Sequence, residues 1–237
     1  GIHVKGFFEN LGFFASRFNQ AIVITIELSI ISLVAATIIG IIVGLVNTSK
    51  SKSVIMKILK AIANLYIYII RGTPMLVQIL IIYFGLGQML RPTRFRWLNI
   101  GGTFTAGTVA LSLNAGAYMA EIVRGGIEAV DKGQIEAARS LGLTYGKTMK
   151  KIVLPQALRT MLPSIINQFI ISIKDTSLLS VIGLTELTNV GKTIAATQSA
   201  HMMVIYCFMA CYYLFICTVL APVSYTHLRA HETLANL

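Results

Sequence analysis

Five long apolar runs constrain this chain more than any other feature of its sequence. They cover about residues 21–46, 61–90, 103–120, 162–187 and 202–223. Each is near or above the roughly 20 residues that an α-helix needs to cross the hydrocarbon core of a bilayer. An open strand would leave its backbone groups unpaired in lipid, so the runs are expected to be helices. The sequence therefore predicts an all-α integral membrane protein with five transmembrane helices.

Composition agrees with a membrane protein and argues against two other classes. Only 12% of the residues are charged, whereas soluble domains carry about 25%. The net charge of +11 does not indicate a nucleic-acid partner, because the Lys and Arg residues lie in the loops between apolar runs. Cys207, Cys211 and Cys217 share one apolar run without CxxC spacing, so they are interpreted as small hydrophobic residues and not as a disulfide or metal framework.

The basic residues predict which loops face the cytoplasm. The loops after the first and third runs hold eleven: Lys50, Lys52, Lys57, Lys60, Arg124, Lys132, Arg139, Lys147, Lys150, Lys151 and Arg159. The loops after the second and fourth runs hold four: Arg91, Arg94, Arg96 and Lys192. By the positive-inside rule the N-terminus, with an extracytoplasmic segment over residues 1–20, lies outside and the C-terminus lies in the cytoplasm.

Both ends of the chain carry expectations of their own. The chain starts at Gly1 without an initiator Met, so we expect a truncated N-terminus or an upstream domain. The last apolar run is expected to stop at Pro222. Residues 223–237 resemble translated sequencing-adapter read-through, and we treat them as a non-native tail. His227 and His231 in that tail are therefore given no metal or catalytic role.

A polar, basic block lies between the third and fourth apolar runs, over residues 121–163. Gly133 to Leu141 contains good helix formers. Gly142 suits the left-handed position that follows a helix end. A second basic helix is expected from about Tyr145, and Pro155 is expected to end or kink it. Residue pattern alone leaves two interpretations open, an amphipathic interfacial helix and a docking surface for a partner.

This block resembles the "EAA" loop of ABC-importer permeases. The match is Glu136-Ala137-Ala138, then Gly142, then Ile152-Val153-Leu154-Pro155. Three further segments are similar to signatures of the polar amino-acid (His/Glu/Gln/Arg/opine) branch: Arg71 to Gln78, Leu113 to Ile127 and Lys174 to Leu178. The four signatures stand in the expected order over about residues 20–220.

The resemblance implies a type I ABC importer permease (MetI-like) fold in a prokaryotic plasma membrane. It implies a transmembrane domain over residues 21–222 with a cytoplasmic coupling loop over 124–160, and two permease subunits around one path. Two ABC ATPase subunits, which bind ATP and Mg²⁺, would dock on this loop, and an extracytoplasmic binding protein or domain would deliver a polar amino acid. The implied coupling residues are Gly133, Glu136, Ala137, Ala138, Gly142 and Pro155. No cofactor is expected on this chain itself.

Candidates for the substrate path are the polar residues at membrane depth, where charges usually face a cavity or a partner. A break in the fourth run at Lys174-Asp175, with Thr176 and Ser177, would free backbone groups to bind a zwitterion. A Lys174–Asp175 neutralisation is the alternative. Asn114, Tyr118 and Glu121 share one helix face, which either lines the path or forms a hydrogen-bonded seam. For Arg71, a structural role at a kink is preferred over carboxylate binding.

ATP hydrolysis is assigned to a separate subunit. Gly191-Lys192-Thr193 resembles the end of a P-loop, but the earlier glycine of that motif would fall at Glu186. A rival function is an ATP-independent secondary transporter or channel with a coupling-ion site at Lys174 and Asp175. The five runs without an internal repeat argue against that rival. Which amino acid is carried, and whether the two permeases are identical, stay open.

Overall fold

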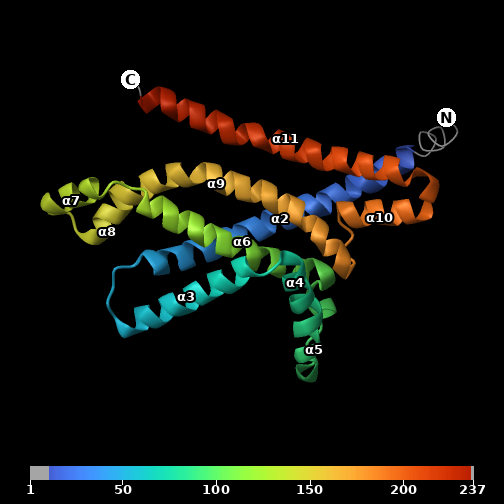
Figure 1. Ribbon diagram of the computed structural model, residues 1–237, viewed down its shortest axis with the longest axis horizontal. Coiled ribbons are helices and arrows are strands. Elements are labelled where there is room, and N and C mark those ends of the chain that lie inside the picture. The colour runs from blue at the N-terminus through green and yellow to red at the C-terminus, as the bar shows by residue number, and fades with distance from the viewer. Residues whose placement is uncertain (1–10, 236–237) are drawn as a thin grey trace.

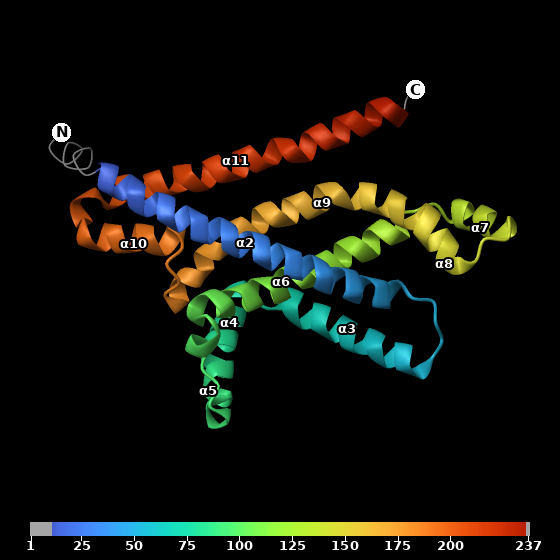
Figure 2. The same ribbon diagram turned by 180° about the vertical axis from the view of Figure 1, so that it is seen from behind.

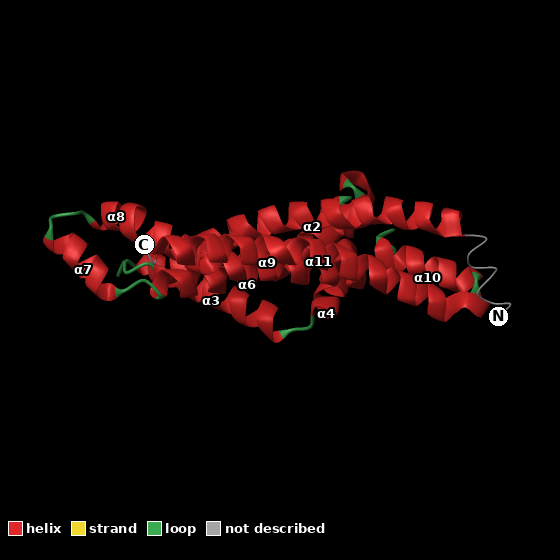
Figure 3. Ribbon diagram, turned by 90° about the horizontal axis from the view of Figure 1, so that it is seen from above, coloured by secondary structure: helices red, strands yellow, loops and turns green. Residues whose placement is uncertain are grey.

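A computed structural model describes residues 11–235, and all the regular structure in that range is helical. Figure 1 and Figure 2 show long helices lying side by side, with the N-terminal end of α2 near α10 and the C-terminal end of α11 near the opposite end of the bundle. The short helices α7 and α8 project beyond that opposite end (Figure 3). The predicted all-α class is confirmed. Residues 1–10 of the expected N-terminal segment lie outside the described residues.

Helices α2 (Leu11–Thr48) and α6 (Gly102–Glu128) form the centre of the bundle. α2 begins ten residues before the expected first span, so residues 11–20 are helical and continuous with it. Gly40 and Gly44 face α6, and a Cβ atom added to Gly40 would come within 2.3 Å of Met119 Cβ. These glycines therefore allow the two helix backbones to approach closely.

The second apolar run is two helices that meet at a sharp elbow. α3 (Val54–Gly72) ends before the extended residue Thr73, and Pro74 precedes α4 (Met75–Leu80). A π-helical stretch, η1 (Ile81–Leu86), and α5 (Gly87–Met89) continue α4, and this segment is bent by 111° from α3. Figure 1 shows α4 and α5 leaving the bundle sideways. Two short 3-10 helices, η2 (Arg91–Thr93) and η3 (Trp97–Ile100), lead back to α6.

Within residues 11–235, three stretches are long and apolar enough to cross a membrane: Gly12–Thr48, Tyr145–Ile182 and Met202–Leu220. The bent pair α3 with α4–α5 makes a fourth if it counts as one span. The expected third span, now α6, is absent from this set. Its buried side includes Gly, Ala, Ser and Asn residues, because neighbouring helices and not lipid cover it. Helix packing in membranes favours such small and polar residues, and they lower the mean hydropathy of the helix.

The fourth span is a continuous helical stretch of mixed geometry. This stretch consists of α8 (Tyr145–Thr148), the π-helical η4 (Met149–Val153), α9 (Leu154–Asp175) and the 3-10 helix η5 (Thr176–Ile182). The helix α7 (Lys132–Ser140) precedes it and is separated from it by a turn. Of the two outcomes expected at Pro155, an end or a kink, the structure excludes the end, because the helix continues through it. Pro155 lies in the first turn of α9, where its missing N–H costs little, and the preceding π turn absorbs the change of hydrogen bonding.

The expected break at Lys174-Asp175 is also absent. The chain tightens from α to 3-10 geometry there and turns at Gly183, whose φ is +79°. Backbone groups at Lys174 and Asp175 thus stay within helical geometry.

The last part of the chain packs on the N-terminal half of α2. Glu186 caps α10 (Leu187–Thr197) by accepting hydrogen bonds from the backbone N–H groups of Thr188 and Asn189, at 2.7 Å each. A short 3-10 helix, η6 (Ser199–His201), then leads into α11 (Met202–Ala235). The helix α11 continues through Pro222, whereas the part of it that is apolar enough to cross a membrane is Met202–Leu220. The interpretation of residues 223–237 as non-native stays a prediction.

Candidate functional site

A cavity of about 620 Å³ lies between the C-terminal end of α3, the second half of α6 and the middle of α9. Its size falls within the roughly 300–1,000 Å³ typical of small-molecule sites. Charged and polar side chains give it two kinds of lining. Ionisable groups come from α3 and α6, and amide and hydroxyl groups come from α9: Arg71, Tyr118, Glu121, Thr160, Ser164, Asn167 and Gln168.

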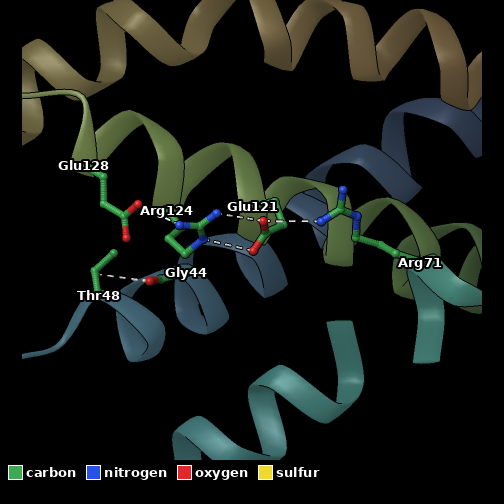
Figure 4. A network of polar contacts seen from close by, with 6 residues as sticks. All are labelled: Gly44, Thr48, Arg71, Glu121, Arg124 and Glu128. Atoms are coloured by element: carbon green, nitrogen blue, oxygen red, sulfur yellow. Dashed lines mark hydrogen bonds and ion pairs between the residues drawn. The ribbon is translucent and has the colours of Figure 1, made fainter. Parts of the chain in front are cut away.

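Glu121 is the centre of a chain of ion pairs along one side of this cavity. Its Oε2 atom lies 3.3 Å from Arg71 Nη1 and 3.0 Å from Arg124 Nη2. Arg124 in turn bonds Glu128 one turn further along α6, at 2.6 Å. Figure 4 shows Arg71 reaching Glu121 from a different helix than Arg124. The ion pairs therefore tie the end of α3 to α6, with one cation and one carboxylate exposed to the cavity.

Tyr118 completes the charged side of the cavity. The Arg71 guanidinium lies over its ring, with Cζ 5.5 Å from the ring centroid. Such a contact is worth about 0.5–1 kcal/mol at an exposed site and holds the guanidinium in place. A flat cation, a carboxylate and an aromatic ring thus lie within one cavity, an arrangement that suits a small zwitterion.

Asn114 does not join Tyr118 and Glu121 in this cavity. It is buried one turn earlier, where its Nδ2 donates to Gln78 Oε1 at 2.9 Å. Gln78 Nε2 donates to the carbonyls of Ile70 and Thr73 at the α3–α4 elbow, at 2.8 and 3.0 Å. Pro74 lacks the N–H that a continuous helix would offer to the Ile70 carbonyl. Gln78 supplies that donor, so the predicted face divides into a seam at Asn114 and a cavity wall at Tyr118 and Glu121.

The residues from Lys174 to Ser177 lie apart from the cavity that Arg71 lines. Thr176 is fully buried and its hydroxyl donates to the Ile173 carbonyl at 2.6 Å. The Ser177 hydroxyl donates to the Lys174 carbonyl, also at 2.6 Å. Lys174 is exposed and forms no ion pair with Asp175 in the described part of the chain. These four residues are therefore not brought together with Glu121.

The loop that is predicted to have a coupling role carries α7 and α8, which form the projecting end of the molecule seen in Figure 3. Asp131 caps α7 by accepting from the Gly133 backbone N–H, and Thr144 caps α8 by accepting from Lys147. Gly142 has a φ of +82°, which confirms its predicted left-handed conformation. The Arg139 guanidinium donates to the Leu143 carbonyl at 3.0 Å across this turn. The loop is thus a defined helix–turn–helix whose tip faces away from the bundle.

The residues exposed on and beside α7 differ from the coupling residues that the resemblance implies. Glu136 and Ala137 are exposed, but Ala138 is only 3% exposed and packs against its own chain. Leu141, just before the turn, is 85% exposed. A single exposed apolar side chain is common on protein surfaces, but Leu141 also lies at the tip of a projecting loop, where a partner can reach it. The candidate contact surface is therefore Glu136, Ala137 and Leu141.

Sequence reasoning missed three features of these sites. Arg71 lines the cavity, whereas the sequence favours a structural role for it. Asn167 and Gln168 line it as well, and two adjacent amides in an apolar run are a usable signal for such a role. Leu141 is exposed, although the sequence indicates only a helix-forming residue there, and its place directly before Gly142 is the one sign of exposure.

Comparisons with known proteins agree with this architecture. A family model for the "Binding-protein-dependent transport system inner membrane component" matches residues 36–229. The glutamine transport system permease protein of Escherichia coli (strain K12) is 41% identical over 197 residues, which are 83% of this chain and 84% of the relative. The arginine transport system permease protein of Bacillus subtilis (strain 168) is 40% identical over 168 residues, 71% of each.

Two solved structures are similar in fold. A crystal structure of an amino acid ABC transporter with histidines has a TM-score of 0.82 and 33% identity, covering 94% of this chain and 98% of the other. An inward-facing methionine ABC transporter has a TM-score of 0.67 and covers 89% and 95%. At 19% identity that second likeness concerns the fold alone.

Proposed function

Because the chain belongs to the family of binding-protein-dependent transport system inner membrane components, we propose that its cavity binds a polar amino acid on the path of an ATP-driven importer. The chain is a permease subunit of the amino-acid ABC importer class. The observation that carries the proposal is the Arg71–Glu121 pair in the cavity wall.

An α-amino acid carries the two charges that this pair would bind. The Arg71 guanidinium presents a planar set of donors that matches a carboxylate, and the Glu121 carboxylate accepts from an ammonium group. When the zwitterion enters, each protein charge exchanges one partner of opposite sign for another. The net charge of the cavity stays constant, which limits the desolvation cost of loading. The amides of Asn167 and Gln168 are then placed to meet a polar side chain.

The relatives transport glutamine and arginine by their names, and both amino acids have hydrogen-bonding side chains. We assign this chain the same broad class of cargo. A binding protein would deliver it at the end of the bundle near α10, in the periplasm or outside the cell. Two permeases would form the path. Two ATPases, which bind ATP and Mg²⁺, would contact Glu136, Ala137 and Leu141. Closure of the ATPases would move α7 and switch the cavity between the two sides of the membrane.

The rival function, an ion-coupled secondary transporter, needs a coupling-ion site at Lys174 and Asp175. The neighbouring hydroxyls of Thr176 and Ser177 donate to carbonyls of their own helix, and none of the four residues lines the cavity. These placements support the ATP-driven proposal over its rival.

The test is amino-acid uptake into proteoliposomes that contain the permease with its ATPase and binding protein. We expect Arg71→Gln and Glu121→Gln each to raise the KM for uptake by on the order of ten- to a hundredfold, since a hydrogen bond to a charged group is worth about 1.5–3 kcal/mol. Arg91→Gln in η2 and Glu27→Gln in α2 make the same chemical changes away from the cavity and should leave uptake unchanged. Uptake that is equally insensitive to all four changes would exclude the cavity from the path.

A further inference from the structure

A second cavity lies at the end of the bundle that carries α7, and it is unlike the first. Its volume is about 540 Å³, again within the range of small-molecule sites. Its walls come from the C-terminal end of α2, from α3, from the end of α6, and from α7 and α8. It therefore joins the membrane helices to the coupling loop.

The charges around this cavity are mainly positive. Lys50, Lys60 and Lys132 line it, and Glu128 is the carboxylate among its lining residues. Glu128 already bonds Arg124 at 2.6 Å, so its charge is largely balanced. Lys60 donates to the Ser49 carbonyl, which fixes its ammonium group at the cavity. Three cations against one paired carboxylate would attract an anion.

Polar groups beside these cations suit a ligand that also carries hydroxyl groups. Asn47 lines the cavity, and its Oδ1 atom is buried without a hydrogen-bond donor among the described residues. Buried acceptors in proteins almost always have a donor. Tyr145 also lines the cavity, from the start of α8. A phosphate ester with a hydroxylated headgroup would satisfy both the lysines and the acceptor.

The surface beside the cavity indicates that the anion belongs to a lipid. The part of α3 from its start to Lys60 also exposes large apolar side chains: Val54, Ile55, Ile58 and Leu59, which are 69%, 70%, 55% and 42% exposed. Apolar side chains directly beside lysines are typical of the boundary between acyl chains and headgroups. Basic pockets between membrane helices on the cytoplasmic side are known to hold anionic headgroups.

We infer that this cavity binds the phosphoglycerol headgroup of an anionic phospholipid, with its acyl chains along the apolar face of α3. The regulatory part rests on the proposed function, which places this end of the bundle in the cytoplasm and makes α7 the contact with the ATPase. Lys50 and Lys60 belong to the membrane helices and their loop, whereas Lys132 is the first residue of α7. A headgroup that bridges them braces α7 against the bundle, so the coupling of ATP hydrolysis to transport depends on anionic lipid.

Lipid binding is tested on the purified full chain, without any ATPase, by native mass spectrometry with added phosphatidylglycerol or phosphatidylcholine. The cavity variant Lys50→Gln/Lys60→Gln/Lys132→Gln is compared with Lys147→Gln/Lys150→Gln/Lys151→Gln, which removes three exposed cations of the same loop region that do not line the cavity. We expect phosphatidylglycerol to bind wild type and control alike, at least about tenfold more weakly to the cavity variant, and in clear preference to phosphatidylcholine.

Three outcomes would overturn the inference. Equal loss of phosphatidylglycerol from both triple variants would mean diffuse attraction to basic loops. Displacement of the lipid by inorganic phosphate or glycerol 3-phosphate at similar concentration would assign the site to a free phosphate. If the cavity variant still bound phosphatidylglycerol as tightly as wild type, the lipid would bind elsewhere. The exposed apolar face of α3 would then be free to contact a second permease. If the cavity variant does not fold, Lys50→Gln/Lys132→Gln serves instead, because it keeps the Lys60 bond to Ser49.

The regulatory part has its own measurement, so the two proposals fail separately. ATPase activity of the reconstituted complex is compared in vesicles with and without phosphatidylglycerol. We expect the lipid to raise substrate-stimulated hydrolysis in wild type and not in the cavity variant. If the lipid binds without this effect, the binding site stands and the dependence of coupling on the lipid is rejected. If no ATPase associates with the permease, the proposed function is contradicted and the lipid-binding result is unaffected.

Discussion

At the scale of residues, a few positions set the distance between helices. Gly40 and Gly44 bring α2 against α6, and Gly126 does the same for α6 and α9, where an added Cβ would come within 2.3 Å of Met161 Cγ. Gln78 supplies the donors that Pro74 cannot. The cavity wall at Glu121 keeps its place because these contacts fix α6 on three sides.

Gly40→Ala is expected to destabilise the protein by about 1–3 kcal/mol, the usual cost of overpacking, because the new Cβ would lie 2.3 Å from Met119 Cβ and 2.9 Å from the Met119 carbonyl carbon. Gly12→Ala in the same helix is the control, since nothing lies within 4 Å of its added Cβ. Alanine favours a helix over glycine, so the control should be neutral or slightly stabilising. Thermal unfolding in detergent measures both, and equal midpoints would contradict the close packing of α2 on α6.

At the scale of elements, the projecting loop depends on one turn. α7 ends at Ser140, and the left-handed Gly142 redirects the chain into α8. An L-residue in that conformation costs roughly 1–2 kcal/mol. The turn carries Leu141 at its tip, so a change at Gly142 would move the exposed leucine relative to α7.

Gly142→Ala is therefore expected to lower substrate-stimulated ATPase activity of the reconstituted complex severalfold while the permease stays folded. Gly146→Ala is the matched control: Gly146 lies in α8 with open space around it, and it has no positive φ. Its activity should equal that of wild type. A Gly142→Ala complex with full activity would show that the geometry of this turn does not matter for coupling.

At the scale of the whole molecule, sequence patterns predicted the helical class, the order of the elements and the projecting loop. Apolar runs and a glycine in left-handed conformation are local signals, and they held at α2, α11 and Gly142. The patterns did not predict the 111° elbow after α3, because Arg71 to Pro74 marks an interruption but not its angle. They predicted a break at Lys174-Asp175, whereas the helix there only changes from α to 3-10 geometry.

The candidate cavity shows the same limit. Helical periodicity put Asn114, Tyr118 and Glu121 on one face, yet α4 covers the first of them and leaves the other two open. Which part of a face is covered depends on where a distant segment, here Gln78, comes to lie. Arg71 could be weighed from sequence as a carboxylate-binding residue, but only its 3.3 Å contact with Glu121 places it in the cavity.

The most direct test of the central claim is substrate-stimulated ATP hydrolysis by the reconstituted permease, ATPase and binding protein. The account predicts that the loaded binding protein stimulates ATP hydrolysis with wild type and with Arg91→Glu in η2. Glu136→Lys, which reverses a charge on the exposed side of α7, should abolish this stimulation or the binding of the ATPase. A purified chain that carries amino acid or ion flux alone, with no ATPase bound, would contradict it.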